Sequence, residues 1–136
     1  MTYYNLQVHS AYDLLNSTIK YTELFSKLKK DGQDSVVITD PTLYGAIKAY
    51  KIAKKFDVNL VHGLEIKLGY GISFLKFNIL CKNTEMFYRL LEISTMIENK
   101  VEWSIEKLVE ELKKSKEDFV IIVIDELRDS MEFSYL

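Results

Sequence analysis

The chain has 136 residues with a formal net charge of -2, 48% hydrophobic residues and 28% charged residues, which is ordinary for one globular domain. This balance excludes a global basic field for nucleic acid, and no apolar run reaches the ~18 residues of a membrane span. Cys81 is the only cysteine, which excludes an internal disulfide and favours a cytoplasmic location for a single domain over residues 1–136.

Hydrophobic spacing predicts strands and helices in alternation. Tyr21, Leu24, Phe25 and Leu28 have the spacing of one buried helix face, and Gly32 follows as a stop signal. The predicted elements, in chain order, are a strand at 3–9, a helix containing 21–28, a strand at 35–39, a helix containing 49–56, strands at 59–68 and 72–81, helices at 84–98 and 104–115, and a strand at 119–124.

This order predicts an α/β fold with mainly parallel strands and a β-hairpin near 59–81. The last strand, 119–124, is apolar without alternation, which is typical of a strand covered on both faces in a parallel sheet. Only a short polar segment follows it. We therefore expect a fragment of a longer polypeptide, or a domain completed by a partner.

Polar side chains stand near the ends of three predicted strands. His9 ends the first strand, Asp40 follows the second, and Glu65 lies within the third. Because active groups of α/β folds gather at the carboxyl ends of strands, one imidazole and two carboxylates could converge on a divalent cation. A helix cap or turn former is an equally good interpretation of Asp40. His62, a lone histidine before a glycine, is typical of a partly exposed strand or turn.

Several segments in order resemble the start of the PHP (polymerase and histidinol phosphatase) domain of bacterial DNA polymerase III alpha subunits. The resemblance covers residues 3–124 and implies a distorted (β/α)7 barrel, of which this chain would hold the first half. The matching segments are Gln7-Val8-His9-Ser10, Tyr12 to Asn16, Thr39-Asp40-Pro41, Gly45 to Lys55, Gly63-Leu64-Glu65 and the stretch "FNILCKNTEMFYRLLEIST".

The departures from the family pattern concern its metal site. The resemblance implies a cluster of two or three metal ions that activates water for phosphoester hydrolysis. Here Gln7 stands in place of the first histidine of the pair, no histidine follows Asp40, and Asn16 replaces the usual aspartate. A neutral amide is a poorer ligand than imidazole. Only His9, Asp40 and Glu65 remain as ligand positions, so we expect no catalytic residue and no bound cofactor in this chain.

The resemblance implies a metal-free structural scaffold within a DNA-directed DNA polymerase, a nucleotidyltransferase of DNA replication that uses magnesium in another domain. Its partners would be the remainder of the polymerase chain, replisome subunits and, through the parent chain, DNA, with no membrane. One alternative is a metal-dependent phosphoesterase or proofreading 3'-5' exonuclease of the PHP family. Another is a free-standing interaction module unrelated to replication.

Two surface features leave further interpretations open. The lysines at 48–55 could contact DNA or another subunit, or could form a solvated helix face. A half-barrel would also expose sheet edges that a complete barrel closes. We therefore expect these edges to pair with another copy of the chain in a homodimer.

Overall fold

The computed structural model describes residues 4–70, 73–99, 103–114 and 119–124. Helices and strands follow one another much as the hydrophobic spacing predicts. The elements are α1 (Tyr21–Lys30), β1 (Ser35–Ile38), α2 (Ala46–Phe56), β2 (Asn59–Tyr70), β3 (Ser73–Cys81), α3 (Thr84–Glu98), α4 (Ile105–Lys113) and β4 (Phe119–Ile124). Among the described residues, no helix is both long enough and apolar enough to cross a membrane.

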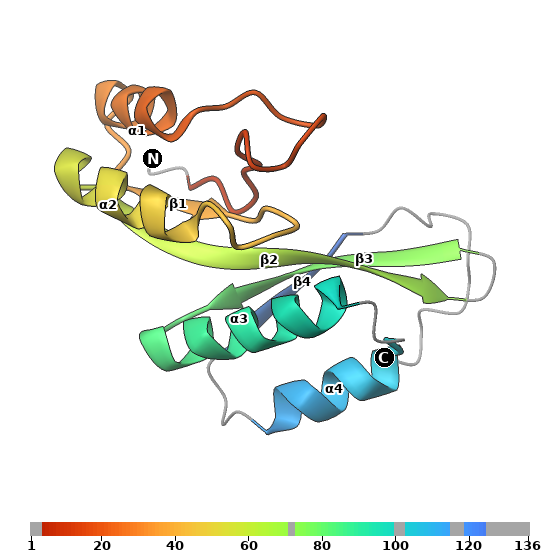
Figure 1. Cartoon of the computed structure of the whole chain (residues 1–136). Coiled ribbons are helices and arrows are strands. Elements are labelled where there is room, and N and C mark those ends of the chain that lie inside the picture. The colour runs from red at the N-terminus through yellow and green to blue at the C-terminus, as the bar shows by residue number, and fades with distance from the viewer. Residues whose placement is uncertain (1–3, 71–72, 100–102, 115–118, 125–136) are drawn as a thin grey trace.

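Strand β2 connects the two halves of the sheet, whose strand order is β1-β2-β3-β4. Residues 59–62 of β2 pair with β1 in parallel, and residues 63–70 pair with β3 antiparallel. Figure 1 shows β2 as a long ribbon that runs from the α1–α2 end of the molecule to the β2–β3 hairpin. The hairpin predicted near 59–81 is therefore confirmed.

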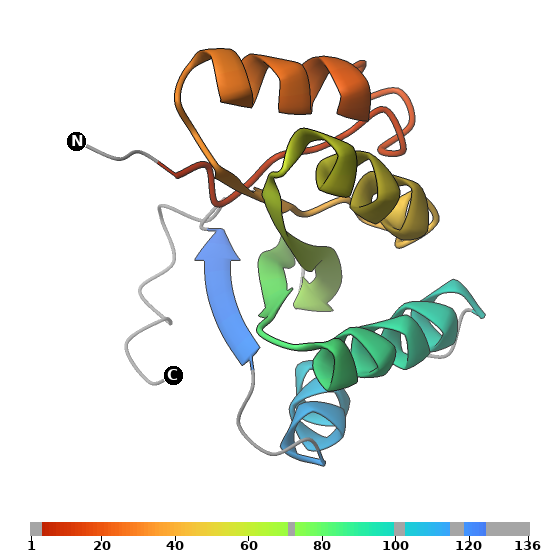
Figure 2. The same ribbon diagram turned by 90° about the vertical axis from the view of Figure 1, so that its left-hand side faces the viewer.

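Each half of the sheet has its own hydrophobic core. Phe25 of α1, Val36 of β1 and Ala49 of α2 belong to the first core. Ile79 of β3 and Leu90 of α3 belong to the second, which also includes residues of α4. Figure 2 shows α1 and α2 together on one side and α3 and α4 together on the other.

The prediction of mainly parallel strands is wrong for the described sheet. Only the β1–β2 pairing is parallel, because β4 also pairs antiparallel with β3. Two helices, α3 and α4, lie between β3 and β4. A single helix after β3 would carry the chain back to the level of the start of β3, so that the next strand would run parallel to it. Two helices carry the chain back and then forward again to the end of β3, so β4 begins beside Cys81, pairs there through Phe119 and runs antiparallel.

Strand β4 also differs from the strand covered on both faces that its apolar sequence predicts. It is an edge strand of the described sheet, and Val120, Ile121 and Val123 are 41%, 51% and 53% exposed. Continuous apolar character marks a strand that can be buried, but which elements cover it depends on chain segments far away in sequence. Pairing of this edge with another copy stays a prediction.

The predicted strand at 3–9 forms only an isolated parallel bridge within its described residues, between Val8 and Ile38. The Val8 N–H donates to the Val37 carbonyl at 3.2 Å, and the Thr39 N–H donates to the Val8 carbonyl at 2.9 Å. Leu6, by contrast, is 53% exposed, so the alternating pattern of this segment is not matched by burial. The bridge nevertheless places residue 9 beside the end of β1.

Candidate functional site

The candidate site lies where the segment after Val8, the end of β1 and the middle of β2 meet. His9 follows the Val8 bridge, Asp40 lies two residues after β1, and Glu65 lies in β2. The Glu65 N–H donates to the Asp40 carbonyl at 3.1 Å, which ties the last two segments together. The structure thus brings all three predicted positions to one region.

His9 contacts two carboxylates, one through each ring nitrogen. Its Nδ1 lies 2.6 Å from Oδ2 of Asp13, and its Nε2 lies 2.9 Å from Oε2 of Glu65. The His9 Nε2 and Glu65 Oε2 atoms are both buried. Despite their short separation they do not form a hydrogen bond with each other, and neither forms one with any other described residue. Glu65 therefore lies against the His9 ring without a hydrogen bond to it, whereas the contact with Asp13 fixes the orientation of the ring.

Asp13 is a site residue that the sequence analysis missed. It is buried, with 4% of its surface exposed, and its other carboxylate oxygen accepts a hydrogen bond from the Asn16 amide at 3.0 Å. Burial acts to raise the pKa of Asp13, but hydrogen bonds from Asn16 and His9 outweigh it, and the net pKa lies below the ordinary value. Asp13 is therefore ionised beside His9 at neutral pH.

Lys76, which the sequence analysis also missed, supplies a positive charge from the neighbouring strand β3. Its Nζ lies 3.3 Å from Oε1 of Glu65. Glu65 thus lies between the His9 imidazole and the Lys76 ammonium, with a side chain only 10% exposed. The lysine satisfies the carboxylate oxygen that the imidazole does not contact.

The side chain of Asp40 accepts hydrogen bonds from Ser10, and not from the side chains of His9 or Glu65. The Ser10 N–H donates to Asp40 Oδ1 at 2.6 Å, and the Ser10 hydroxyl donates to Oδ2 at 2.5 Å. The Tyr21 hydroxyl lies 3.1 Å from the same Ser10 oxygen. Burial raises the pKa of Asp40, although both Ser10 hydrogen bonds oppose the rise. Asp40 therefore anchors the segment that carries His9, and each of its carboxylate oxygens already accepts a hydrogen bond from Ser10.

The donor set is a poor fit to a metal cluster. No three His, Cys, Asp or Glu side chains converge as metal ligands among the described residues. The carboxylates of Asp13, Glu65 and Asp40 already have partners, and the Lys76 ammonium would repel a cation bound at Glu65.

Asn78 on β3 is the register partner of Glu65, so their side chains share one face of the sheet. It is fully buried, and neither amide atom makes a hydrogen bond within the described residues. Buried polar groups without partners are rare and costly. Neither the ion pairs nor the Asp40–Ser10 hydrogen bonds account for this buried amide.

Comparison with known proteins identifies the family. The family model of the PHP domain matches residues 5–127. The chain belongs to the PHP domain family. The chain is 36% identical over 104 residues to the DNA polymerase III subunit alpha of Bacillus subtilis, covering 74% of this chain and 9% of that protein. The same subunit of Staphylococcus epidermidis is 33% identical over 121 residues, covering 87% of this chain and 11% of that protein.

The PHP chain thus spans about a tenth of the length of these relatives. A solved structure of a candidate metal-dependent phosphoesterase from Bifidobacterium adolescentis is also similar, with a TM-score of 0.50, 16% identity, and coverage of 83% of this chain and 44% of that chain. At this identity the likeness concerns the fold alone. The α/β class and the PHP resemblance of the sequence are confirmed.

Proposed function

We propose that the chain is the N-terminal part of the PHP domain of a bacterial DNA polymerase III alpha subunit. Relatives with that name match 74% and 87% of the chain while only 9% and 11% of their own length is covered, which supports a much longer parent. Residues 1–136 then form one unit that contributes the first half of a PHP barrel. The remainder of the barrel and the polymerase follow in the parent chain.

Within that parent the unit serves as a metal-free structural scaffold. The observation that carries this proposal is the position of Lys76, whose Nζ lies 3.3 Å from Glu65 Oε1. A carboxylate that is mostly buried needs a positive partner. The ammonium supplies that charge from the fold itself, and a divalent ion at Glu65 would face a repulsion on the order of several kcal/mol.

The scaffold acts through the rest of the replication machinery. Its partners in this proposal are the remainder of the polymerase chain, replisome subunits and DNA, in the cytoplasm. The parent polymerase uses magnesium in a domain outside these residues to join nucleotides. The exposed apolar side chains of β4 support an interaction of this edge, either with the parent chain or with a second copy.

A second candidate function is that of a metal-dependent phosphoesterase or proofreading 3'-5' exonuclease. The buried Nε2 of His9, the buried Oε2 of Glu65 and the Asn78 amide favour it, because none of these atoms makes a hydrogen bond within the described part of the chain. Such atoms are the ones that a ligand could satisfy. Lys76 is the feature that argues against this candidate.

An activity assay separates the two candidates. The purified chain is incubated with manganese or zinc and with a phosphomonoester or a single-stranded oligonucleotide, and released phosphate or nucleotide is measured. The scaffold proposal predicts no metal-dependent turnover above the level of a Glu65→Ala variant. Metal-dependent turnover that is lost in both His9→Ala and Glu65→Ala would favour the phosphoesterase or exonuclease over the scaffold.

A further inference from the structure

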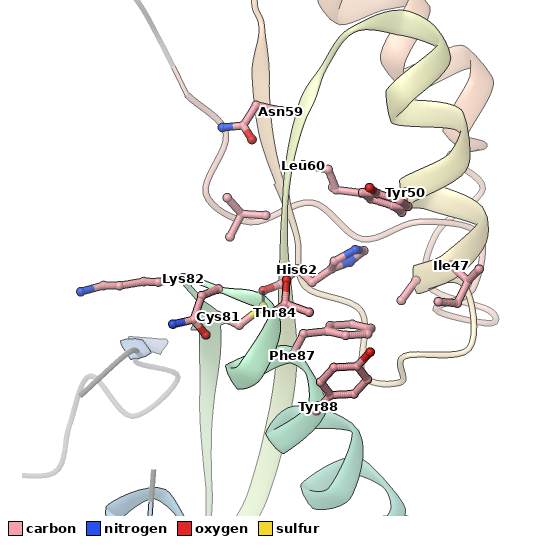
Figure 3. Close-up of a pocket in the computed structure, with 13 residues that line it drawn as sticks. Ile47, Tyr50, Asn59, Leu60, His62, Cys81, Lys82, Thr84, Phe87 and Tyr88 are labelled. Atoms are coloured by element: carbon pink, nitrogen blue, oxygen red, sulfur yellow. Dashed lines mark hydrogen bonds between the residues drawn. The ribbon is translucent and has the colours of Figure 1, made fainter. Parts of the chain in front are cut away.

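A second feature of the molecule is a pocket of about 560 Å³ between helix α2, the start of strand β2 and the first turns of helix α3. It lies outside the His9–Glu65 site. Figure 3 shows Ile47 and Tyr50 approaching it from α2, His62 from β2, and Phe87 and Tyr88 from α3. Pockets of this size bind small molecules or single groups of larger ligands.

Aromatic rings form much of the pocket. The His62 and Phe87 ring centroids are 5.0 Å apart with planes tilted by 41°, and those of Phe87 and Tyr88 are 6.3 Å apart. Tyr50 and Tyr88 are 49% and 62% exposed, so about half or more of each residue's surface is accessible to solvent. Exposed aromatic faces beside a pocket are well suited to stack on a flat ring.

His62 adds hydrogen-bonding capacity to the pocket. Burial lowers its pKa to about 4, so the ring is neutral at pH 7 and has one donor and one acceptor nitrogen. Within the described part of the chain its ring contacts Phe87, and its main-chain carbonyl accepts from the Cys81 thiol at 3.0 Å. The two ring nitrogens are therefore available to the edge of a planar polar ring.

Positive charge lines the same region along helix α2. Lys51, Lys54 and Lys55 are exposed, and Ala46–Phe56 contains no acidic residue. Lys48 lies toward Tyr12, with its Nζ 6.0 Å from that ring centroid. The Lys54 Nζ lies 5.2 Å from the ring centroid of Tyr50, which lines the pocket. A chain of net charge -2 thus carries a local cationic helix face beside an aromatic pocket.

We propose that this pocket and the lysine face of α2 bind single-stranded DNA, with one unstacked base among Tyr50, His62, Phe87 and Tyr88 and the adjacent phosphates along the lysines. The flat ring of a base can stack on the aromatic side chains of the pocket, and the anionic DNA backbone can pair with the lysines of α2. A duplex keeps its bases stacked and could use only the lysines. The inference rests on the proposed function in one respect: a replicative parent chain would bring single-stranded DNA to the domain.

Fluorescence anisotropy of a labelled oligodeoxythymidine of about ten nucleotides tests the proposal. The chain should bind it, and the affinity should fall as salt rises. Tyr50→Ser with Tyr88→Ser should weaken binding roughly 5- to 150-fold, the range expected for loss of stacking on one base. Lys51→Gln with Lys54→Gln should lower the salt slope by about 1.4. Lys113→Gln, an exposed lysine on α4, is the matched control and should have little effect.

Three results would overturn the proposal: no binding, equal losses in the Lys113→Gln control, or equal affinity for a duplex of the same length. Oligouridine is run in parallel, because RNA shares the chemistry, and tighter binding of RNA would replace DNA as the ligand. All of the substituted side chains are exposed, and thermal melts check that each variant folds. Metal binding at His9 and Glu65 is measured in a separate experiment. A failure to bind single-stranded DNA would therefore leave the scaffold proposal unaffected.

Discussion

The Nζ of Lys76 on β3 lies 3.3 Å from Oε1 of Glu65 on β2, so two adjacent strands are joined by an ion pair inside the candidate site. Removing the ammonium leaves a carboxylate that is 10% exposed without its positive partner on β3. We predict that Lys76→Met lowers the free energy of unfolding by about 1–3 kcal/mol. Urea denaturation at neutral pH measures the change.

The matched control for Lys76→Met is Lys67→Met. Lys67 is the register partner of Lys76 but is exposed, and its Nζ lies over the Phe74 ring at 4.6 Å. Its substitution should change stability by no more than about 0.5 kcal/mol. Equal effects of the two substitutions would show that Lys76 contributes only as a surface charge.

Asp13 should make the free energy of unfolding fall at acid pH. Because its folded-state pKa is below the ordinary value of 3.8, its contribution is present above that value and is lost as the pH falls through the folded-state pKa. Asp13→Asn should therefore cost about 1–3 kcal/mol at pH 7 and progressively less at pH values below 3.8. Urea denaturation across this range measures both effects. Asp57→Asn, at an exposed position, is the control, and a cost for Asp13→Asn that does not change with pH would contradict the assignment.

Gly63 lies where β2 changes its partner from β1 to β3. A Cβ there would be 2.7 Å from Leu80 Cδ2, 2.9 Å from Thr39 Cγ2 and 3.2 Å from the Ile79 carbonyl. We predict that Gly63→Ala lowers the melting temperature, at a cost of about 1–3 kcal/mol. Gly69→Ala in the same strand is the control, because its new Cβ would have no atom of another described residue within 4 Å apart from its chain neighbours. Similar melting temperatures for the two variants would disprove the close approach.

His62 should add a second pH dependence. Its folded-state pKa of about 4 is below the ordinary 6.5, so between these values the unfolded chain binds a proton that the folded chain does not. Stability is then fully present above pH 6.5 and falls as the pH drops toward 4. His62→Phe should remove on the order of 1–2 kcal/mol of this decline, measured by urea denaturation at several pH values. An unchanged pH profile would show that the ring is already well solvated.

The sequence predicted local elements better than the relations between them. Helix α3 was predicted at roughly its observed bounds, 84–98, and its buried residues Met86, Leu90 and Ile93 repeat with helical spacing. The direction of β4 could not be predicted in the same way, since it depends on two helices returning the chain to Cys81. Hydrophobic spacing records which side chains are buried but not which strand lies next to them.

At the candidate site, too, contacts set by nearby sequence are easier to predict than contacts set by the pairing of strands. His9 and Glu65 meet as expected from strand ends, whereas Asp40 is occupied by Ser10. Asp13 could have been found, since it lies four residues after His9 and can reach it through one turn of chain. Lys76 could not, because its contact with Glu65 depends on the register of the β2–β3 hairpin.

The central claim is that the ammonium of Lys76, rather than a group of metal ions, neutralises the acidic side chains at the His9 site. Native mass spectrometry of the purified chain, after incubation with manganese or zinc and removal of free metal, tests it most directly. The account predicts that the wild-type chain retains no tightly bound ions and that Lys76→Met increases metal retention. Two or more ions retained by the wild-type chain, and lost in His9→Ala, would contradict it.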